Sequence, residues 1–285
     1  MNPESLLFDQ LKKSFDTYSK SQKALARLIL TDYQKVAFLT IKGFAKLSGI
    51  SEATIVRFVK ILGFEGYPDF QREIRRIVRS DLKGDERFKI GYEIKGQEGK
   101  RISEIIEKEI DNFNHLQKIF DSQAIKEAAL SIKNSTDVYI VGTRSSASLA
   151  CHFSFGLSKL KIRTTRILKI SSEFFDLLDG LGSGALLVII GFPRYVNELL
   201  DVLAFCRGRK IKTIALTDSP FSLLKGDINL YSPAESYSFM AFHCAPLVLI
   251  NAVVIELSML NIKTSIGVLN RFETLAESKN YFSKT

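Results

Sequence analysis

Polar and charged side chains follow the ends of several apolar runs in the second half of the sequence. The runs VYIV, ALLVII and IKTIALT end in GTRSS, GFPRYV and TDSPFS, and Glu235 precedes a long apolar segment. Hydroxyls, a guanidinium group and the backbone N–H groups of a helix start are the donors that bind a phosphate or a carboxylate. We therefore expect an anion-binding site made by Ser145, Ser146, Arg194, Tyr195, Thr217, Ser219 and Glu235. The alternative is that turns rich in Ser and Pro need no ligand to explain them.

A second group of polar residues lies in the segment FAKLSGISEATIVRFVKILGF, residues 44–64. Ala45 allows two helices to cross closely, and Gly49, four residues later, suits a turn that needs a positive φ. Ser51 is a good N-cap for the second helix. Helical spacing buries one face of that helix, with Ile55, Phe58, Val59 and Leu62. The spacing predicts a helix-turn-helix, although an ordinary helical hairpin has the same Ala and Gly spacing.

The outward face of the second helix carries groups that read DNA. We expect base-edge contacts from Ser51, Glu52, Thr54 and Arg57, and phosphate contacts from Lys60, Lys42, Lys46 and Tyr67. An arginine in this position is a natural donor to guanine. Residues 1–90 hold 17 Lys and Arg against 11 Asp and Glu, so most of the formal charge of +9 lies there. That excess favours a polyanionic partner.

The elements that must position these residues divide the chain into two domains. Apolar residues recur at helical spacing through residues 1–80, residues 81–101 are charged and glycine-rich and predict a linker, and residues 102–285 begin with a helix to about Phe120. Short apolar runs then alternate with helical stretches, which predicts a doubly wound, flavodoxin-like α/β domain with a five-stranded parallel sheet. The apolar stripe of the helix 102–120, which includes Ile106, Ile110 and Phe113, must be covered by the second domain or by a partner subunit.

Several other classes of protein are disfavoured. None of the three histidines falls in an expected ligand loop, His243 is placed inside an apolar helix, and no nucleophile elbow or metal-spaced carboxylate set occurs, so we expect no enzyme activity, cofactor or metal. Cys151, Cys206 and Cys244 are widely spaced and indicate buried thiols in a reducing cytoplasm. The apolar segment 241–260 contains Pro246, Asn251 and Glu256 and predicts a core helix, not a membrane span.

The run SGISEATIVRFVKILGFEGYPDFQREI resembles the helix-turn-helix of the MurR/RpiR regulators. The family pattern is matched by Gly49, Ser51, Ala53, Thr54, Arg57, Phe58, Leu62, Gly63, Phe64, Gly66, Tyr67 and Phe70. The resemblance covers nearly the whole chain, because members of this family carry a sugar-isomerase-like SIS domain after the DNA-binding domain. It implies a cytoplasmic, nucleoid-associated regulator of a catabolic operon that binds a near-palindromic DNA operator as a homodimer or homotetramer and responds to a phosphosugar.

One loop departs from the family pattern. After the third strand the family has S-x-S-G-x-T, whose hydroxyls wrap a phosphate, whereas this chain has GFPRYV at 191–196. Arg194 and Tyr195 supply a guanidinium and a phenol instead, which suits a carboxylate or a differently placed phosphate. The expected effector is therefore a small anionic metabolite, either a phosphosugar or a carboxylate. Two alternatives stay open: a SIS domain kept for oligomerisation alone, and a sugar-phosphate isomerase that does not bind DNA.

Overall fold

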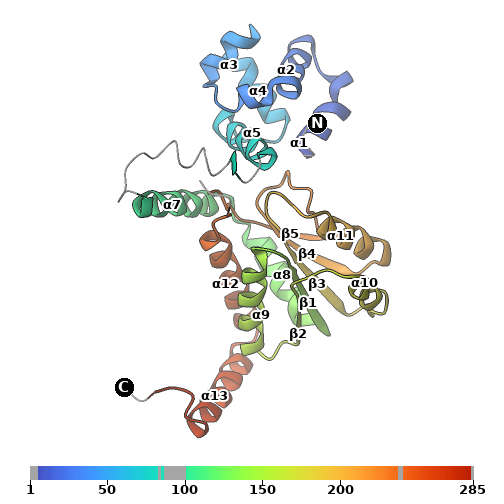
Figure 1. The fold of residues 1–285 in the computed structure, drawn as a ribbon, viewed down its shortest axis with the longest axis vertical. Helices are drawn as coiled ribbons and strands as arrows, with labels where there is room; N and C mark the ends of the chain where they lie inside the picture. The colour runs from blue at the N-terminus through green and yellow to red at the C-terminus, as the bar shows by residue number, and fades with distance from the viewer. Residues whose placement is uncertain (1–5, 83–84, 87–100, 237–239, 284–285) are drawn as a thin grey trace. The chain divides into compact units, whose positions relative to one another are not determined.

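The computed structural model describes residues 6–82, 85–86, 101–236 and 240–283. These residues belong to two compact units (Figure 1). Residues 83–84 and 87–100 of the expected linker, and residues 1–5 of the expected first domain, lie outside the described part of the chain. The boundaries 1–80, 81–101 and 102–285 therefore stay a prediction.

The first unit is all-helical, as expected. Its elements are α1 (Leu6–Lys13), a 3-10 turn η1 (Phe15–Thr17), α2 (Lys20–Val36), α3 (Ile41–Ser48), α4 (Glu52–Ile61) and α5 (Tyr67–Asp81). Four phenylalanines, Phe8, Phe44, Phe58 and Phe70, are fully buried in its core. Phe44 stacks on Phe70 with ring centroids 6.5 Å apart, so α3 and α5 are held together by aromatic packing.

The second unit is the expected doubly wound α/β domain. Its elements in chain order are α7 (Arg101–Ile119), α8 (Ser122–Asn134), β1 (Asp137–Gly142), α9 (Ser146–Lys159), β2 (Thr164–Ile167), α10 (Ser172–Asp179), β3 (Ala185–Ile190), α11 (Asn197–Arg209), β4 (Lys212–Thr217), β5 (Ile228–Tyr231), α12 (Cys244–Met259) and α13 (Ile262–Ser278). The strands are all parallel and lie in the order β2-β1-β3-β4-β5, which is the flavodoxin-like order.

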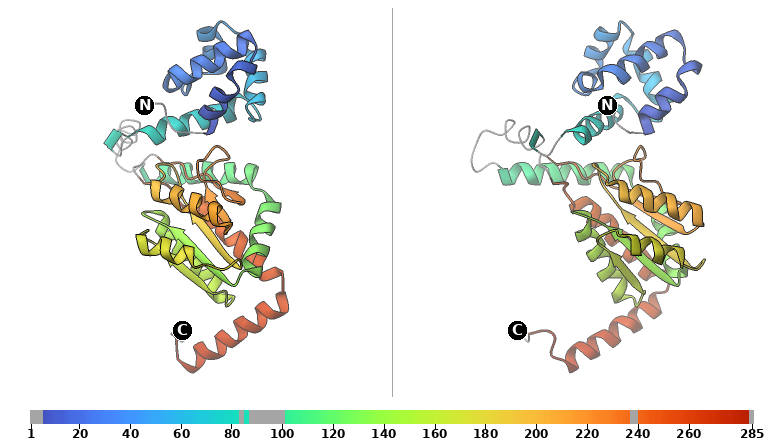
Figure 2. Two further views of the ribbon diagram at one scale, coloured as in Figure 1. Left: turned by 90° about the vertical axis from the view of Figure 1, so that its right-hand side faces the viewer. Right: turned by 45° about the vertical axis from the view of Figure 1, so that its right-hand side comes forward.

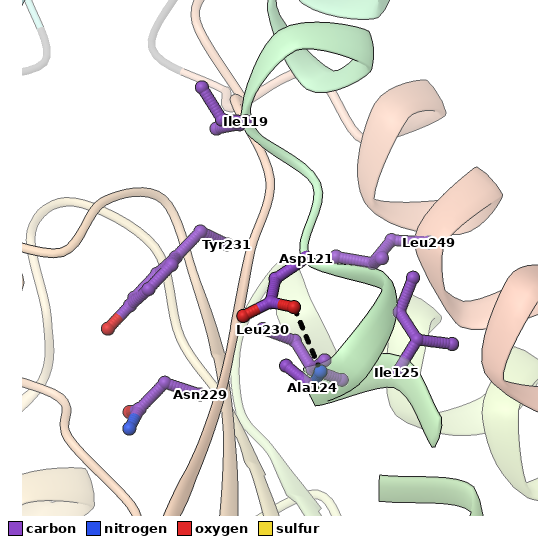
Figure 3. A pocket seen from close by; sticks show the side chains of 8 residues that line it. All are labelled: Ile119, Asp121, Ala124, Ile125, Asn229, Leu230, Tyr231 and Leu249. Atoms are coloured by element: carbon purple, nitrogen blue, oxygen red, sulfur yellow. Dashed lines mark hydrogen bonds between the residues drawn. The ribbon is translucent and has the colours of Figure 1, made fainter. Parts of the chain in front are cut away.

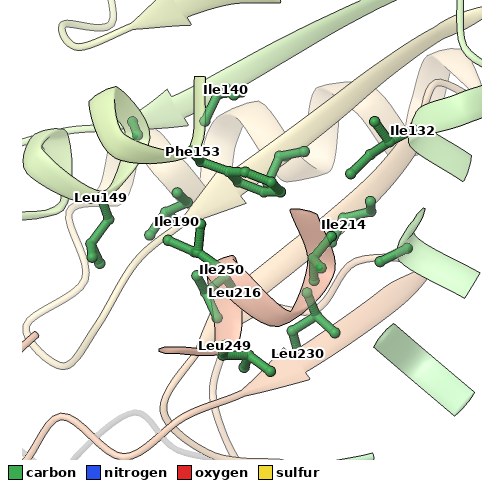
Figure 4. Close-up of a cluster of buried hydrophobic side chains, with 14 of the residues drawn as sticks. Ile132, Ile140, Leu149, Phe153, Ile190, Ile214, Leu216, Leu230, Leu249 and Ile250 are labelled. Carbon is green, nitrogen blue, oxygen red and sulfur yellow. The ribbon is translucent and has the colours of Figure 1, made fainter. Parts of the chain in front are cut away.

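Helices cover both faces of this sheet because its strands are apolar on both sides. In β3, Leu186, Val188 and Ile190 pack under α8, α9 and α12, while Leu187 and Ile189 pack under α10 and α11 (Figures 1 and 4). Every residue of β3 is buried. A central strand without a polar face is what a doubly covered parallel sheet requires.

The turn from β1 into α9 has no room for a side chain at Gly142. A Cβ atom there would lie 2.7 Å from the carbonyl oxygen of Ser146 and 3.0 Å from the Cβ of Ala150. Glycine thus lets the first turn of α9 lie against the end of β1, which brings Ser145 and Ser146 to the carboxyl edge of the sheet.

The structure also departs from the sequence-based expectations. The helices α8 and α13 were not anticipated. Of the three cysteines, Cys206 is buried as expected and burial raises the pKa of its thiol to about 12, but Cys151 is half-buried and Cys244 is exposed.

No single helix among the described residues is long and apolar enough to cross a membrane. The pair α12 and α13 passes that test when taken together, across a bend of 106°.

The Gly142 contact predicts a stability effect. We expect Gly142→Ala to lower the free energy of unfolding by about 1–3 kcal/mol, because the helix start or the strand end must shift to admit the methyl group. Thermal unfolding followed by circular dichroism measures this. Gly208→Ala in α11 is the matched control, since a Cβ there meets nothing within 4 Å and alanine favours a helix by roughly 0.5–1 kcal/mol. Equal melting temperatures for Gly142→Ala and the wild type would contradict the argument.

Candidate functional site

The α3–turn–α4 segment is built by two caps and one left-handed residue. The hydroxyl of Thr40 accepts the N–H of Gly43 (3.2 Å) at the start of α3, and that of Ser51 accepts the N–H of Thr54 (3.3 Å) at the start of α4. Gly49 has φ of +68° and donates its N–H to the carbonyl of Ala45. These are the roles that the sequence pattern predicts for Gly49 and Ser51, and together they set the angle between the two helices.

Burial of one face of α4 determines what its other face presents. Ile55, Phe58, Val59 and Leu62 are at most 1% exposed. Ser51, Glu52, Arg57 and Lys60 are exposed on the opposite side, and Thr54 is half-buried between them. The structure thus brings together on one helix all five residues that we expect to contact DNA from α4.

A short hydrogen-bond chain runs along this exposed face. The hydroxyls of Ser51 and Thr54 are 2.9 Å apart, and the guanidinium of Arg57 donates to the Thr54 hydroxyl over 3.2 Å. The chain holds the guanidinium close to the helix start. One of its five N–H donors is used there, so four are left for a guanine edge or a phosphate.

The cations beside this face are unpaired in the described part of the chain. Lys42 and Lys46 on α3 and Arg57 and Lys60 on α4 are exposed, and no described carboxylate lies within ion-pair distance of any of them. Their charge is therefore available to a polyanion.

Tyr67 has a different role from the expected phosphate contact. It is 6% exposed, and its hydroxyl donates to the carbonyl of Leu39 over 2.8 Å. Burial raises the pKa of its phenol to about 12. The side chain holds the start of α5 to the α2–α3 connection, and we withdraw it from the proposed DNA contacts.

The expected anion site lies at the carboxyl edge of the sheet, where the loops after β1, β3 and β4 meet. Arg144 and Arg194 follow the neighbouring strands β1 and β3, and both are exposed in the left-handed region with φ of +53° and +64°. A left-handed conformation is unfavourable for arginine and is often found in ligand loops. Ser145 is exposed and makes no capping bond, whereas Ser146 is 6% exposed. Arg144 was not among the residues selected from the sequence.

Tyr195, Thr217 and Asp218 join the loops after β3 and β4 at this edge. The phenol of Tyr195 donates to the carboxylate of Asp218 and lies 3.3 Å from the hydroxyl of Thr217. Thr217 is 0% exposed and also donates to Asp218 (3.2 Å), and Ser219 is 7% exposed. Their burial is evidence against the expected direct ligand contacts of Thr217 and Ser219. Nothing in the sequence pattern pointed to Asp218 as the acceptor that joins the two loops.

Glu235 is bound to α7. Its carboxylate pairs with the ammonium of Lys108 at 2.6 Å. Asn112 is 2% exposed and holds the backbone of Glu235 twice, donating to its carbonyl (3.0 Å) and accepting from its N–H (3.2 Å). The expected contact of Glu235 with the effector stays a prediction, and such a contact would have to compete with the ion pair to Lys108.

The same face of α7 reaches the start of α12. Glu109 accepts the N–H of Cys244 (3.4 Å) and an N–H of the Asn112 amide (3.2 Å). Lys108, Glu109 and Asn112, which we call the α7 clamp, thus join α7 to α12 and to Glu235 in the segment 232–236 after β5, which we call the 235 loop. The apolar residues of α7 recur at helical spacing on the opposite face, so the sequence pattern did not indicate the polar contacts of the clamp.

His243 precedes α12 and is not inside a helix, so its sequence-based placement is wrong. Its ring lies 5.8 Å from the ring of Phe192 in the loop after β3, and its buried Nε2 has no hydrogen-bond partner among the described residues. Burial lowers its pKa, against the opposing charge of Glu109. A neutral imidazole whose nitrogen has no hydrogen-bond partner can form a hydrogen bond with a hydroxyl group, or with a carboxylate or phosphate oxygen, of a ligand.

A cavity of about 250 Å³ lies elsewhere, beside the edge strand β5 (Figure 3). Its lining residues are Ile119, Asp121, Ala124, Ile125, Asn229, Leu230, Tyr231 and Leu249. The carboxylate of Asp121 caps α8 by accepting from Gln123 and Ala124, and the amide of Asn229 bonds to Gly226. The lining of this cavity contains none of the residues that we expect to bind the effector. In the part of the chain that the structure describes, no group of His, Cys, Asp or Glu side chains is arranged to hold a metal ion.

Comparison with known proteins matches both halves of the chain. The helix-turn-helix domain of the rpiR family matches residues 5–79, and the SIS domain matches residues 131–256. An uncharacterized HTH-type transcriptional regulator of Clostridium perfringens is 23% identical over 234 residues, covering 81% of this chain and 83% of that protein. The HTH-type transcriptional regulator HexR of Pseudomonas aeruginosa is 19% identical over 243 residues, with the same coverage of 81% and 83%.

A solved structure has the same fold along nearly the whole length. The Vibrio vulnificus NanR protein, complexed with ManNAc-6P, is 17% identical, has a TM-score of 0.58 and covers 95% of this chain and 98% of its own.

The burial of the His243 ring predicts that its pKa is lower than that of a free histidine. Because burial lowers its pKa, the folded chain binds fewer protons here than the unfolded chain, so this residue stabilises the fold above pH 6.5 and loses that contribution as the pH falls. NMR of the histidine rings, with His243→Gln to assign the signal among the three histidines, should give a midpoint below 6.5. A midpoint at or above 6.5 would show that the Glu109 charge outweighs burial.

Proposed function

Since the chain belongs to the RpiR family of helix-turn-helix proteins and carries a SIS domain as its second half, we propose that it is a transcriptional regulator. In this proposal α3 and α4 bind a near-palindromic duplex, and the α/β unit binds a small anionic metabolite at the carboxyl edge of its sheet. The protein acts in the cytoplasm at the nucleoid, as a homodimer or homotetramer, on a catabolic operon. The proposed domains are residues 1–80 and 102–285, joined by a linker at 81–101.

The observation that carries the DNA-binding half is the exposed face of α4. Its cations are unpaired within the described residues, and its opposite face is fully buried, so the helix cannot turn its polar side inward. A second helix with polar residues at its start is the geometry that enters a major groove. We assign base contacts to Ser51, Glu52, Thr54 and Arg57, and phosphate contacts to Lys42, Lys46 and Lys60.

The proposal that the α/β unit binds an effector rests on positive charge and a neutral imidazole at the carboxyl edge of the sheet. Arg144 and Arg194 are exposed at the ends of neighbouring strands, and Ser145 offers a hydroxyl beside Arg144. Guanidinium groups bind carboxylates and phosphates through paired hydrogen bonds. In place of a loop of hydroxyls around a phosphate, we propose that two arginines bind the acidic group and that His243 binds a second polar group of the metabolite.

The alternative function, a sugar-phosphate isomerase without DNA binding, needs a base and an acid beside the substrate. Glu235, the carboxylate selected from the sequence, is paired with Lys108 at 2.6 Å, and Thr217 is buried. His243 alone does not supply both roles. We therefore propose that the protein is not an enzyme.

The α7 clamp provides a route from the effector site to the DNA-binding unit. It holds the 235 loop and the start of α12, where His243 lies, and α7 itself begins directly after the linker. A ligand that binds His243 and moves the start of α12 changes the contacts that Glu109 and Asn112 make. Occupancy of the site is in this way transmitted to the end of α7 that joins the linker.

Arg57→Ala tests the DNA proposal. With a duplex from upstream of the protein's own operon, we expect affinity to fall by about 5–150-fold, as for the loss of one base contact, while binding to random duplex changes little. Lys46→Ala should remove one phosphate contact, and this should reduce the slope of log affinity against log salt concentration by about one. Fluorescence anisotropy across a salt series measures both.

Lys126→Ala in α8 is the matched control, because it removes an exposed charge from the other unit. It should bind DNA as the wild type does. A wild-type protein that binds neither duplex at low salt would overturn the regulator proposal, whereas wild-type affinity in Arg57→Ala would overturn the assignment of the α4 face alone.

A thermal-shift screen of phosphosugars, sugar acids and amino acids tests the effector proposal. A metabolite at about 100 times its Kd stabilises the protein by ~2.7 kcal/mol, which raises the melting temperature by several degrees. We expect Arg194→Ala to abolish that shift. Arg163→Ala should keep it, since Arg163 lies before β2 at the opposite edge of the sheet. A shift that survives in Arg194→Ala would place the ligand elsewhere, and a turnover of any phosphosugar would favour the isomerase.

A further inference from the structure

The strand β2 forms one margin of the sheet, and no strand among the described residues pairs with its outer side (Figure 1). Its inner side pairs with β1, where the N–H of Val138 donates to the carbonyl of Arg163 over 3.1 Å. Successive residues of a strand point their backbone groups to opposite sides, so the N–H and C=O groups of Thr164 and Arg166 point outward. The helix α13, which follows α12, extends away from the sheet and does not run along β2 (Figures 1 and 2). The strand therefore leaves a row of backbone donors and acceptors open.

The side chains along this margin are cationic. Residues 161–169 contain Lys161, Arg163, Arg166 and Lys169, all exposed, and no Asp or Glu. Arg163 lies 3.4 Å from the carboxylate of Asp137, but its side chain is 80% exposed, and an exposed pair of this kind contributes little. For the other three cations, no described carboxylate lies within ion-pair distance. We call Lys161, Arg163, Thr164, Arg166 and Lys169 the β2 edge.

The arginines of the β2 edge lie on opposite faces of the strand. The hydroxyl of Thr164 lies 2.8 Å from that of Ser154 on α9, and the guanidinium of Arg166 donates to Sγ of Cys151 on the same helix over 3.9 Å. Thr164 and Arg166 thus face α9, and Arg163, which adjoins Thr164, faces the opposite side. A strand added along this margin would therefore meet a guanidinium group on each of its two faces.

We infer that the β2 edge binds an extended, acidic segment of another protein, which adds to the sheet as a new edge strand. The N–H and C=O groups of the segment pair with those of Thr164 and Arg166, as when a peptide joins any exposed strand. Because successive side chains of the segment point to opposite faces, acidic residues at neighbouring positions meet Arg163 on one face and Arg166 on the other. Lys161 and Lys169 flank the two ends of the strand and attract the same charge.

Other occupants match this edge less well. The phosphate oxygens of a nucleic acid accept hydrogen bonds from cations, but they carry no donor for the outward carbonyls of Thr164 and Arg166. A second copy of the chain, paired edge to edge, would place the cations of one copy beside those of the other, and like charges on edge strands keep sheets apart. An acidic peptide satisfies both the backbone groups and the charge.

This inference goes beyond the proposed function, because it needs neither DNA nor effector. A fluorescently labelled peptide of alternating Glu and Val tests it, with binding to the full chain followed by fluorescence anisotropy. We expect saturable binding. Arg166→Glu combined with Lys169→Glu should weaken that binding by about tenfold, as for the loss of two exposed charge pairs and the gain of two repulsions.

A second measurement needs no variant of the protein. The same peptide with every backbone nitrogen methylated keeps its charge but lacks the N–H donors that pair with β2. We expect the wild-type chain to bind it about tenfold more weakly, as for the loss of two hydrogen bonds. Equal affinity for the two peptides would show that charge alone attracts the segment, and it would overturn the added strand.

Lys126→Glu in α8 is the matched control, because it reverses an exposed charge outside the β2 edge. It should bind the peptide as the wild type does. A wild-type chain that does not bind the peptide, or a double variant with wild-type affinity, would overturn the inference. So would tighter binding of single-stranded oligothymidine that depends on Arg166 and Lys169. Each of these results leaves the DNA contacts of α4 unaffected, whereas a protein that binds the peptide but no duplex would overturn the regulator proposal alone.

Discussion

Burial of one face of a helix determines the chemistry of the other, and this constraint determines what both α4 and α7 present. In α4 the buried face is apolar, so polar groups and cations are left outside, where Arg57 is held by Thr54. In α7 the buried face is polar and the exposed face is apolar. Lys108 and Asn112 are 9% and 2% exposed, while Ile105, Ile106 and Ile110 are about half exposed. Buried polar residues are stable there because each has a partner on the 235 loop or α12, and unpartnered they would cost several kcal/mol.

The helix-turn-helix and the sheet could be predicted from the sequence because both depend on local patterns. Gly49 at the turn, Ser51 at the cap and the spacing of Ile55, Phe58 and Val59 are properties of neighbouring residues. Continuous apolar runs alternating with helices predict a doubly wound parallel sheet, and the observed sheet is of that kind, with the flavodoxin-like strand order. The partners of Glu235 and Tyr195 could not be predicted in the same way. Glu235 meets Lys108 across 127 positions of the chain, and Tyr195 meets Asp218 across 23.

The spacing of apolar residues also identifies the apolar stripe of a helix, but it does not show which side of the helix the neighbouring elements cover. The apolar stripe of α7 was expected to need a cover, and most of that stripe is exposed in the described unit, whereas the polar side makes the contacts with α12 and the 235 loop. His243 illustrates a smaller limit. A shift of a few residues in the start of α12 moves this side chain from a helix interior to the loop beside Phe192, and its chemical role changes with it.

The proposed use of arginines as anion ligands at the sheet edge fits the way this edge is built. A hydroxyl loop binds phosphate through many weak donors, which requires the backbone to wrap the ligand closely. In this chain Tyr195, Thr217 and Asp218 bond to one another, so the loops after β3 and β4 are joined before any ligand arrives. Two exposed guanidinium groups can bind an acidic group without closing the backbone around it. In the proposed effector site the braced loops and the two exposed arginines therefore have complementary roles, in which the side chains, not the backbone, would adapt to the anion.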